Sequence, residues 1–281
     1  MKKKINDIST LIGNDHAAYI SFLPLESFDW LNAGFSTRIG GDGSGMFGGL
    51  NLGFGRGDSD EVVWKNWRYL GDLEGFDPDC IVFPNQQHTT ELRAVDERDR
   101  AMGTPPCLNV PIDGQITISR DTVLISYGAD CPSVYLIDPE HHAVGMCHSG
   151  WKGTLNSIAE KAVRLMADTY GTDPARTCAF IGPSICMENY EVGIDVAGPF
   201  IEKHGIDVTA DSAIVKAGKR EGKYQLDLWE ANRRNLIAAG LDEGNIHISG
   251  LCTFGMEELF YSHRRTGTAR GAMAGFIVIR K

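Results

Sequence analysis

A cysteine and a histidine stand at matching ends of two short apolar runs. Cys131 comes just before the run 134–137, and His148 directly follows the run 143–147. Residues 138–140 are typical of a turn, so the two runs predict an antiparallel hairpin. The separation of 17 residues between Cys131 and His148 is what such a hairpin needs to bring both side chains to one sheet end. A thiolate and an imidazole there can bind zinc or copper, or act as a nucleophile with its base.

A second histidine, His88, lies in a polar segment between an apolar run at 81–83 and a predicted strand near 92–95. Such a segment is usually only a solvated turn, so a role for His88 depends on its meeting the other two residues. Two imidazoles and one thiolate leave a fourth position open, which is typical of a catalytic zinc site. Copper suits the same ligands. The alternative for Cys131 is a small buried apolar side chain.

Basic residues beside glycine-rich segments are candidate ligands for an anion. Residues 149–154 contain Lys152 and lead into a predicted helix, whose N-terminal amides favour a negative charge. Arg38 lies beside a glycine-rich segment, and Arg264 and Arg265 lie near the C-terminus. Each guanidinium could form a forked contact with a phosphate. The alternatives are an ordinary strand-to-helix turn and ordinary surface charges.

The elements that must position these residues follow from hydrophobic periodicity. Apolar runs predict buried strands at 122–126, 134–137, 143–146 and 277–279. Helical spacing predicts helices over 154–170 and 228–239, each followed by glycine. The glycine-rich stretch 34–57 predicts a long loop. Hairpin-like strand pairs with few helices favour an α+β fold with mixed sheets covered by helices.

Composition narrows the class of protein. The chain has 281 residues, of which 42% are hydrophobic and 23% charged, so disorder, collagen-like repeats and coiled coil are excluded. No linker or repeat divides it, which predicts a single domain over residues 1–281. A net charge of −10 argues against a nucleic-acid partner. Without a membrane-spanning stretch or a signal peptide, and with seven cysteines but no CxxC pair, we expect a cytoplasmic protein with reduced thiols and no membrane partner.

The motifs together resemble the YfiH-like or laccase-domain family, once called multicopper polyphenol oxidases and now regarded as purine nucleoside phosphorylases. They include Ala-Asp-Cys-Pro at 129–132, His-Ser-Gly-Trp-Lys-Gly-Thr at 148–154 and Ser-His-Arg-Arg at 262–265. The other matching segments are 34–38, 50–53, 86–88, 181–185, 190–193 and 227–228. They occur in the family's order and span roughly residues 33–279.

The resemblance implies that His88, Cys131 and His148 are the metal ligands and form the catalytic centre. It implies an α+β fold in which mixed β-sheets pack face to face with helices on the outside. The implied activity is zinc-dependent phosphorolysis of adenosine, inosine, guanosine and methylthioadenosine, with deamination of adenosine. Purine nucleosides and phosphate are then the expected partners, and no oligomeric state is specified. This sequence departs from the family pattern at Thr89, Lys152 and His263, which bears on loop geometry and substrate preference.

For phosphorolysis, an anion must be held near the ribose while negative charge develops on the departing purine. We take Arg38, Lys152, Arg264 and Arg265 as candidate phosphate-binding residues, and Asn51 as a candidate hydrogen-bond partner of the nucleoside.

Three other classes of function use the same residues. A laccase-like polyphenol oxidase would bind copper, but the sequence lacks the His-x-His pairs and clustered histidines that several copper ions need. A cysteine hydrolase would use Cys131 as nucleophile and His148 as base, so it would resist chelators and be blocked by thiol alkylation. A non-enzymatic metal-binding protein would hold zinc without turning over any nucleoside.

Overall fold

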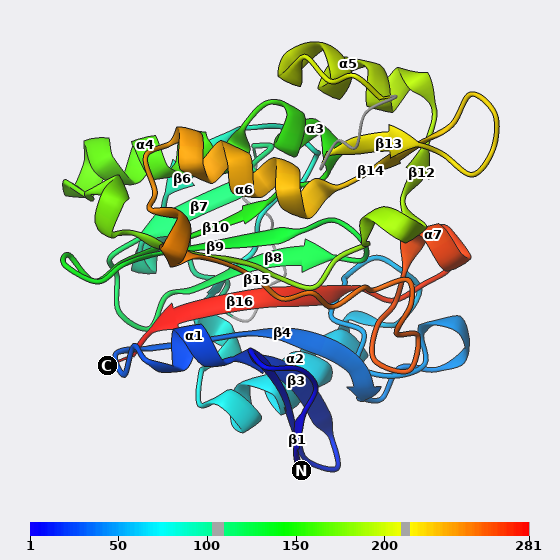
Figure 1. Ribbon diagram of the computed structural model, residues 1–281. Helices are drawn as coiled ribbons and strands as arrows, with labels where there is room; N and C mark the ends of the chain where they lie inside the picture. Colours follow the sequence, from blue (N-terminus) through cyan, green and yellow to red (C-terminus); the bar gives the residue numbers. More distant parts are fainter. Residues whose placement is uncertain (103–109, 209–213, 281) are drawn as a thin grey trace.

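Two mixed β-sheets lie face to face at the centre of the computed structural model, which describes residues 1–102, 110–208 and 214–280. Aromatic side chains from both sheets fill the space between them; Phe22 from one sheet stacks on Phe180 from the other with ring centroids 4.1 Å apart. Helices cover both outer faces (Figure 1). The predicted fold class, an α+β arrangement of mixed sheets with helices outside, is confirmed. Cys107 lies outside the described residues, and the six described cysteines form no disulfide with one another.

The first sheet has seven strands, all antiparallel to their neighbours except β5, which runs parallel to β8. In spatial order they are β1 (Lys2–Lys4), β2 (Ser9–Gly13), β3 (Ala17–Phe22), β4 (Leu31–Gly40), β16 (Met273–Ile279), β8 (Val123–Gly128) and β5 (Ile81–Val82). The last strand of the chain therefore lies between β4 and β8 (Figure 1). Every residue of β16 is buried, as expected for a central strand covered on both faces.

The predicted loop over 34–57 is wrong in its first part, because β4 continues to Gly40. Gly34 does not mark a turn. A side chain there would collide with the rings of Tyr19 and Phe276, at 2.6 and 2.8 Å from the added carbon. This glycine therefore permits close packing inside a strand, and the irregular segment begins only after Gly40, whose φ is 84°.

The second sheet carries the predicted hairpin. Its six strands, in spatial order, are β15 (Ile246–Ile248), β11 (Cys178–Ile181), β9 (Ser133–Asp138), β10 (Ala143–His148), β7 (Gly114–Thr117) and β6 (Leu92–Ala94). The hairpin of β9 and β10 is antiparallel, and the two edge strands run parallel to their neighbours. A small third sheet is formed by β12 (Glu191–Val192), β14 (Tyr224–Leu226) and β13 (Val215–Ala217).

Seven α-helices and several short 3-10 turns complete the described chain. The helices are α1 (Leu23–Glu26), α2 (Asp60–Glu74), α3 (Trp151–Leu155), α4 (Ile158–Tyr170), α5 (Ile194–His204), α6 (Leu228–Ala238) and α7 (His263–Thr266). The 3-10 turns are η1 (Gly45–Phe47), η2 (Pro78–Cys80), η3 (Glu97–Asp99), η4 (Pro174–Arg176), η5 (Met187–Asn189) and η6 (Glu243–Asn245). Among the described helices, none combines the length and apolar character needed to cross a membrane.

The predicted helix over 154–170 is divided in two, whereas the one predicted over 228–239 is confirmed as α6. The break comes at Ser157, which adopts a left-handed backbone conformation with φ of 57°. Its hydroxyl donates to the side-chain oxygen of Asn235 in α6 at 3.2 Å. The turn separates α3, which begins beside His148, from α4, whose apolar face packs on the second sheet.

The carboxyl group of Glu74 should make the free energy of unfolding depend on pH. Glu74 ends α2 half-buried, and burial raises its pKa to about 8 although the charge of Arg280 lowers it. The folded protein thus holds this proton more tightly than the unfolded chain, whose glutamate pKa is about 4.3. The resulting stabilisation is complete below about pH 4 and is lost as pH rises through about 8.

We therefore expect Glu74→Gln to raise the free energy of unfolding by about 1–3 kcal/mol at about pH 9 and to leave it unchanged at about pH 4. Urea unfolding of both proteins at the two pH values measures the difference. An equal gain at both would show that the charge on Glu74 is not responsible.

Candidate metal centre

Three loops and strand ends bring His88, Cys131 and His148 together. Cys131 lies in the turn between β8 and β9, and His148 is the last residue of β10. In the hairpin, His148 pairs with Ser133, two positions after Cys131. His88 comes from the segment between β5 and β6. The predicted meeting of Cys131 and His148 at one end of the hairpin is thus confirmed.

The side chains of these residues form a compact group of possible ligands. One nitrogen of each histidine and the Sγ of Cys131 all lie within 4.8 Å of one another. His88 Nε2 is 4.0 Å from Cys131 Sγ. The two imidazole rings lie edge to face, with centroids 4.7 Å apart and an interplanar angle of 86°. Small movements would bring the three atoms to about 2.0–2.3 Å from one zinc ion, the usual Zn–N and Zn–S distances.

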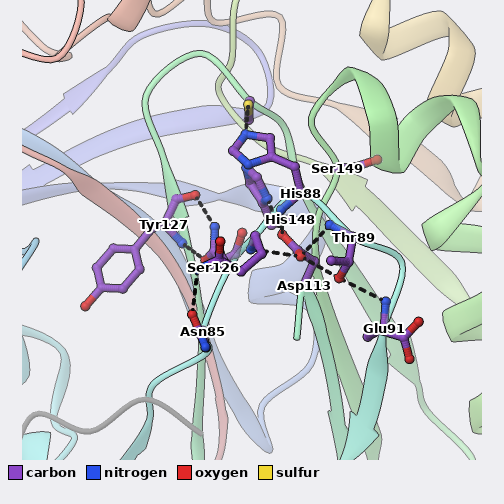
Figure 2. Close-up of polar contacts among 12 residues, drawn as sticks. Asn85, His88, Thr89, Glu91, Asp113, Ser126, Tyr127, His148 and Ser149 are labelled. Atoms are coloured by element: carbon purple, nitrogen blue, oxygen red, sulfur yellow. Dashed lines mark hydrogen bonds and ion pairs between the residues drawn. The ribbon is translucent and has the colours of Figure 1, made fainter. Parts of the chain in front are cut away.

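A buried carboxylate holds His148 in position. Nδ1 of His148 is 2.8 Å from Oδ1 of Asp113 (Figure 2). Only 5% of the His148 side chain and none of the Asp113 side chain is exposed. Because Nδ1 faces the carboxylate, Nε2 is the nitrogen left for a metal ion. A carboxylate behind a metal-binding histidine in this way fixes the ring and its tautomer.

The same carboxylate holds the segment that carries His88. Asp113 accepts hydrogen bonds from the backbone N–H groups of Gln87 at 3.1 Å, His88 at 3.1 Å and Thr89 at 2.7 Å, and from the Thr89 hydroxyl at 2.8 Å. Figure 2 shows dashed lines converging on Asp113 from His148 and Thr89. His88 has a left-handed backbone with φ of 58°, which is uncommon for a residue with a side chain. Asp113 therefore positions both histidines.

The turn that carries Cys131 is tied to the C-terminal part of the chain. The Asp130 carboxylate accepts hydrogen bonds from the hydroxyls of Thr253 at 2.7 Å and Ser262 at 3.0 Å, and from the backbone N–H of Arg264 at 2.6 Å. Asp130 itself has φ of 91°, so these contacts hold a strained turn in place.

A glycine makes room for the group. A carbon added to Gly150 would lie 2.9 Å from Cys131 Sγ and 3.1 Å from His88 Cδ2. Any larger residue at 150 would push apart two of the three side chains. The glycine of the Ser-Gly-Trp motif thus lets the side chains of Cys131 and His88 approach the backbone closely, just before α3 begins at Trp151.

Electrostatics favour a thiolate at Cys131. Burial raises the pKa of this thiol. The positive charge of His148 and hydrogen bonds from His148 and His88 have a larger opposite effect and bring the pKa down to about 6. Burial lowers the pKa of His148, yet the Cys131 thiolate and Asp113 raise it to about 9. Burial raises the pKa of Asp113, and hydrogen bonds from His148 and Thr89 bring it down to about 2. A thiolate is the form of cysteine that binds metal ions.

These values predict selective alkylation of Cys131 in metal-depleted protein. The rate of reaction with iodoacetamide should rise with pH around a midpoint near 6, since the thiolate is the nucleophile. Cys147 should stay unmodified, because burial raises its pKa to about 12. Mass mapping of peptides after short exposures across this pH range measures both rates. A midpoint above about 8, as in a free thiol, would contradict the proposed ion pair.

Two cavities meet at His88 and Cys131, and His148 lines the first of them. The first, about 380 Å³, is lined by residues that include Phe54, Arg56, Gln87, Tyr127 and Arg270. The second, about 320 Å³, is lined by residues that include Trp151, Ile185, Tyr190, Leu228 and Arg264. His88, Ala129, Cys131 and Arg270 line both. The group is therefore accessible from two sides, each large enough for a small molecule.

Of the five residues predicted to bind phosphate or the nucleoside, the structure places one beside the metal-ligand group. Arg264 lines the second cavity, with its guanidinium 5.1 Å from the centroid of the Tyr190 ring. Arg38, Asn51, Lys152 and Arg265 are not among the residues that line either cavity.

Three of these four residues make contacts of a structural kind. Arg265 donates to the carbonyl oxygens of Thr253, Phe254 and Phe260. Asn51 is fully buried, where its side chain donates to Asp58 and accepts from the N–H groups of Gly53 and Ala272. The Arg38 guanidinium lies 4.7 Å from the centroid of the Tyr261 ring. Lys152 is exposed, with Nζ 5.6 Å from the Trp151 ring.

Sequence reasoning missed Asp113, Arg56 and Arg270. A metal-binding histidine generally donates its other N–H to a carboxylate or a carbonyl, which gives a reason to search for an acidic partner. Nothing in the sequence distinguishes Asp113 among 37 acidic residues. The two arginines lack any recognisable motif.

Comparison with known proteins agrees with the family resemblance predicted from the motifs. The family described as "Multi-copper polyphenol oxidoreductase laccase" matches residues 32–280. Purine nucleoside phosphorylase YlmD of Bacillus subtilis is 36% identical over 251 residues, which cover 89% of this chain and 88% of that protein. Adenosine deaminase RL5, from an unknown prokaryotic organism, is 32% identical over 248 residues, covering 88% and 93%.

A solved structure has the same fold. YlmD from Geobacillus stearothermophilus matches with a TM-score of 0.86 at 30% identity, over 96% of this chain and 99% of that chain. The predicted family resemblance is confirmed by these matches.

Proposed function

The chain belongs to the family described as multi-copper polyphenol oxidoreductase laccase, and from that premise we propose that it is a purine nucleoside phosphorylase with a zinc centre. His88, Cys131 and His148 are the proposed ligands. Adenosine, inosine, guanosine and methylthioadenosine are the proposed substrates, with deamination of adenosine as a second reaction. The observation that carries the proposal is the convergence of two imidazoles and a thiolate where two cavities meet.

The donor atoms suit zinc. Two nitrogens and one thiolate leave one position of a tetrahedral zinc ion open to a substrate, as in catalytic sites. When bound, the ion supplies a Lewis acid that stabilises negative charge on a reacting oxygen or nitrogen. Asp113 keeps the Nδ1 face of His148 occupied, so that Nε2 stays directed at the ligand group.

The second cavity suits the nucleoside. Trp151 and Tyr190 offer aromatic faces on which a flat purine can stack, and Ile185 and Leu228 add an apolar wall. The Arg264 guanidinium lies on the same wall and donates to the carbonyl oxygen of Glu191. A base held there would direct its ribose toward His88 and Cys131, which belong to both cavities.

Phosphorolysis transfers a ribosyl group from a purine nitrogen to a phosphate oxygen. The C1′–N bond breaks, the C1′–O bond forms, and the purine leaves with the electron pair and takes up a proton. The chain's part is to hold the two reactants in contact, which can lower the barrier by about 7–11 kcal/mol relative to free reactants. The deamination proposed beside it leaves the C1′–N bond intact: water forms a C–O bond at C6 of adenine, the bond from C6 to the amino nitrogen breaks, and ammonia leaves. The resemblance to adenosine deaminase RL5 favours testing it.

Copper-dependent polyphenol oxidation is the alternative that the family description suggests. Within the described residues, His88, Cys131 and His148 form the single group of three or more histidine, cysteine or acidic side chains able to hold a metal ion. Oxidation by several copper ions needs further clustered histidines. The ligand set therefore supports one metal ion and the nucleoside chemistry above.

The test uses purified protein with its zinc and copper contents quantified. Adenosine is incubated with and without phosphate, and adenine, ribose 1-phosphate and inosine are separated by chromatography. Adenine formed only with phosphate supports the phosphorylase, and inosine formed without phosphate supports the deaminase. No reaction of zinc-loaded protein with adenosine, inosine, guanosine or methylthioadenosine would refute the proposal.

A chelator separates the zinc enzyme from the cysteine hydrolase. Removal of the metal should abolish turnover, and added zinc should restore it. A hydrolase that uses Cys131 and His148 as nucleophile and base would keep its activity after chelation and lose it after alkylation of Cys131. Turnover that persists in metal-free protein therefore contradicts the zinc mechanism.

A further inference from the structure

Two arginines line the first cavity beside the ligand group, and neither faces an acidic residue there. Arg56 and Arg270 are both among its lining residues, together with the side chains of His88, Cys131 and His148. The described residues that line this cavity include no aspartate or glutamate. In a chain with a net charge of −10, an unbalanced pair of guanidinium groups needs an explanation.

Arg270 is held in place but left with an unsatisfied donor. One of its terminal nitrogens donates to the carbonyl oxygen of Gly271 at 2.9 Å. Its Nε is buried and has no hydrogen-bond partner in the described structure. A buried donor that belongs to a charged group and has no partner destabilises the protein. An acceptor in the cavity would remove this destabilisation.

Arg56 increases the positive charge at the same place. It is exposed and makes no hydrogen bond or ion pair with the other described residues. Both arginines line the same cavity. Burial lowers the pKa of Arg270, and the charge of Arg56 lowers it further. Two like charges brought together without a counterion favour an anion between them.

The carboxylate with the strongest influence on Arg270 is already engaged. Asp130 favours the charged form of Arg270, but it accepts hydrogen bonds from Thr253, Ser262 and the backbone of Arg264. It supports the turn of Cys131 and lines the second cavity, not the first. The cavity that contains Arg56 therefore has its positive charge available to a ligand.

We propose that Arg56 and Arg270 bind the inorganic phosphate that attacks the nucleoside, in the first cavity, while the nucleoside occupies the second. This inference rests on the proposed phosphorylase function. The cavities meet at His88, Cys131 and Arg270, so a phosphate oxygen there can form its bond to C1′ as the C1′–N bond breaks and its electron pair goes to the purine. Guanidinium groups present paired N–H donors that match phosphate oxygens.

The experiment measures phosphate binding apart from turnover. Zinc-loaded wild-type protein and the variants Arg56→Gln and Arg270→Gln are compared by equilibrium dialysis with radiolabelled inorganic phosphate. Each variant should bind phosphate about 10- to 100-fold more weakly, since charged hydrogen bonds are lost. In kinetics, the KM for phosphate should rise by the same factor in both variants. Unaltered phosphate affinity in both variants would overturn the proposal.

Two further variants guard against indirect effects. Arg270→Lys keeps the positive charge but loses the paired N–H donors of the guanidinium, so it should bind phosphate with intermediate affinity. A purely structural role of Arg270 would not produce this intermediate value. Arg176→Gln removes an exposed arginine, paired with Glu140 at 2.8 Å, and should leave phosphate binding unchanged. Equal weakening in Arg176→Gln would point to the overall charge and contradict the site.

The source of the phosphate group is tested with adenosine 5′-monophosphate. If it binds more tightly than inorganic phosphate and loses affinity in both arginine variants, the pair recognises a nucleotide and the proposal fails. If inorganic phosphate binds through the two arginines but no base is released from any nucleoside, the anion site stands and the proposed phosphorylase function fails. If phosphorolysis proceeds with an unchanged phosphate KM in both variants, the phosphorylase function stands and the anion site fails.

Discussion

Replacement of His148 by alanine should remove bound metal and catalytic turnover together. The zinc content should fall from about one ion per chain to near zero, because a zinc ion left with His88 and Cys131 keeps two protein ligands instead of three. Turnover with the nucleoside, measured as kcat/KM, should fall by at least about a thousandfold, since a bound metal contributes several kcal/mol to the transition state. Metal analysis and nucleoside turnover on the same preparation give both results.

A matched control exists in the same sheet. His141 donates from Nδ1 to the Asp138 carboxylate at 2.8 Å, the same distance that joins His148 to Asp113. It lies at the other end of the hairpin, so His141→Ala should lose a similar histidine–aspartate hydrogen bond without loss of zinc or activity. The comparison separates the metal site from a general effect of breaking a histidine–aspartate pair.

His148 is buried, so its alanine variant leaves a cavity and removes one of the hydrogen bonds to Asp113, which destabilises the site. His88→Ala answers this objection because His88 is exposed and its loss leaves no cavity in the core. It should also lose zinc and turnover while its thermal unfolding stays close to that of the wild type. Full turnover by a folded, metal-free His148→Ala protein would refute the proposed centre.

The parts of the site that lie within one hairpin could be predicted from the sequence. Cys131 and His148 flank a turn, and the register of an antiparallel pair follows from the length of that turn. The placement of Cys131 and His148 at one end of the hairpin therefore depends only on nearby sequence. His88 comes from a separate segment. Its residue type made it a candidate third ligand, and the resemblance to a family implied the same three residues, but no local pattern could place it beside the hairpin.

The contacts that cross between distant segments could not be predicted. Asp113 lies 35 positions from His148, and Asp130 accepts a hydrogen bond from Ser262, 132 positions away. Those meetings depend on the order of strands, and β16 from the end of the chain is inserted between β4 and β8. No local pattern specifies that order. The same limit explains why Arg56 and Arg270, far apart in sequence, were not recognised as a pair.

Two predictions from local sequence were wrong because a contact with a distant element sets the backbone conformation. The glycine-rich stretch suggested a loop, yet Gly34 permits aromatic packing within β4. The apolar spacing over 154–170 is regular, but Ser157 turns the chain and divides the helix. In each case a contact with another element decides the backbone conformation, and such contacts are absent from a periodicity argument.

The second large effect is expected from Asp113→Asn, because one carboxylate positions both histidines. The wild-type carboxylate accepts from Nδ1 of His148, from three backbone N–H groups and from the Thr89 hydroxyl. An asparagine has a single acceptor oxygen, and its NH₂ group would face donors. We expect the free energy of unfolding to fall by about 1–3 kcal/mol and zinc affinity to fall about 10- to 100-fold.

Asp138→Asn provides the matched control for this variant. Asp138 is also buried, and it accepts from two backbone N–H groups and from the ring of His141. It should therefore lose a similar amount of stability and keep its zinc affinity, which a competitive chelator titration measures. A fall in zinc affinity of equal size in both variants would mean that Asp113 acts through overall stability. A fall confined to Asp113→Asn would show that this carboxylate positions His88 and His148 for the metal ion.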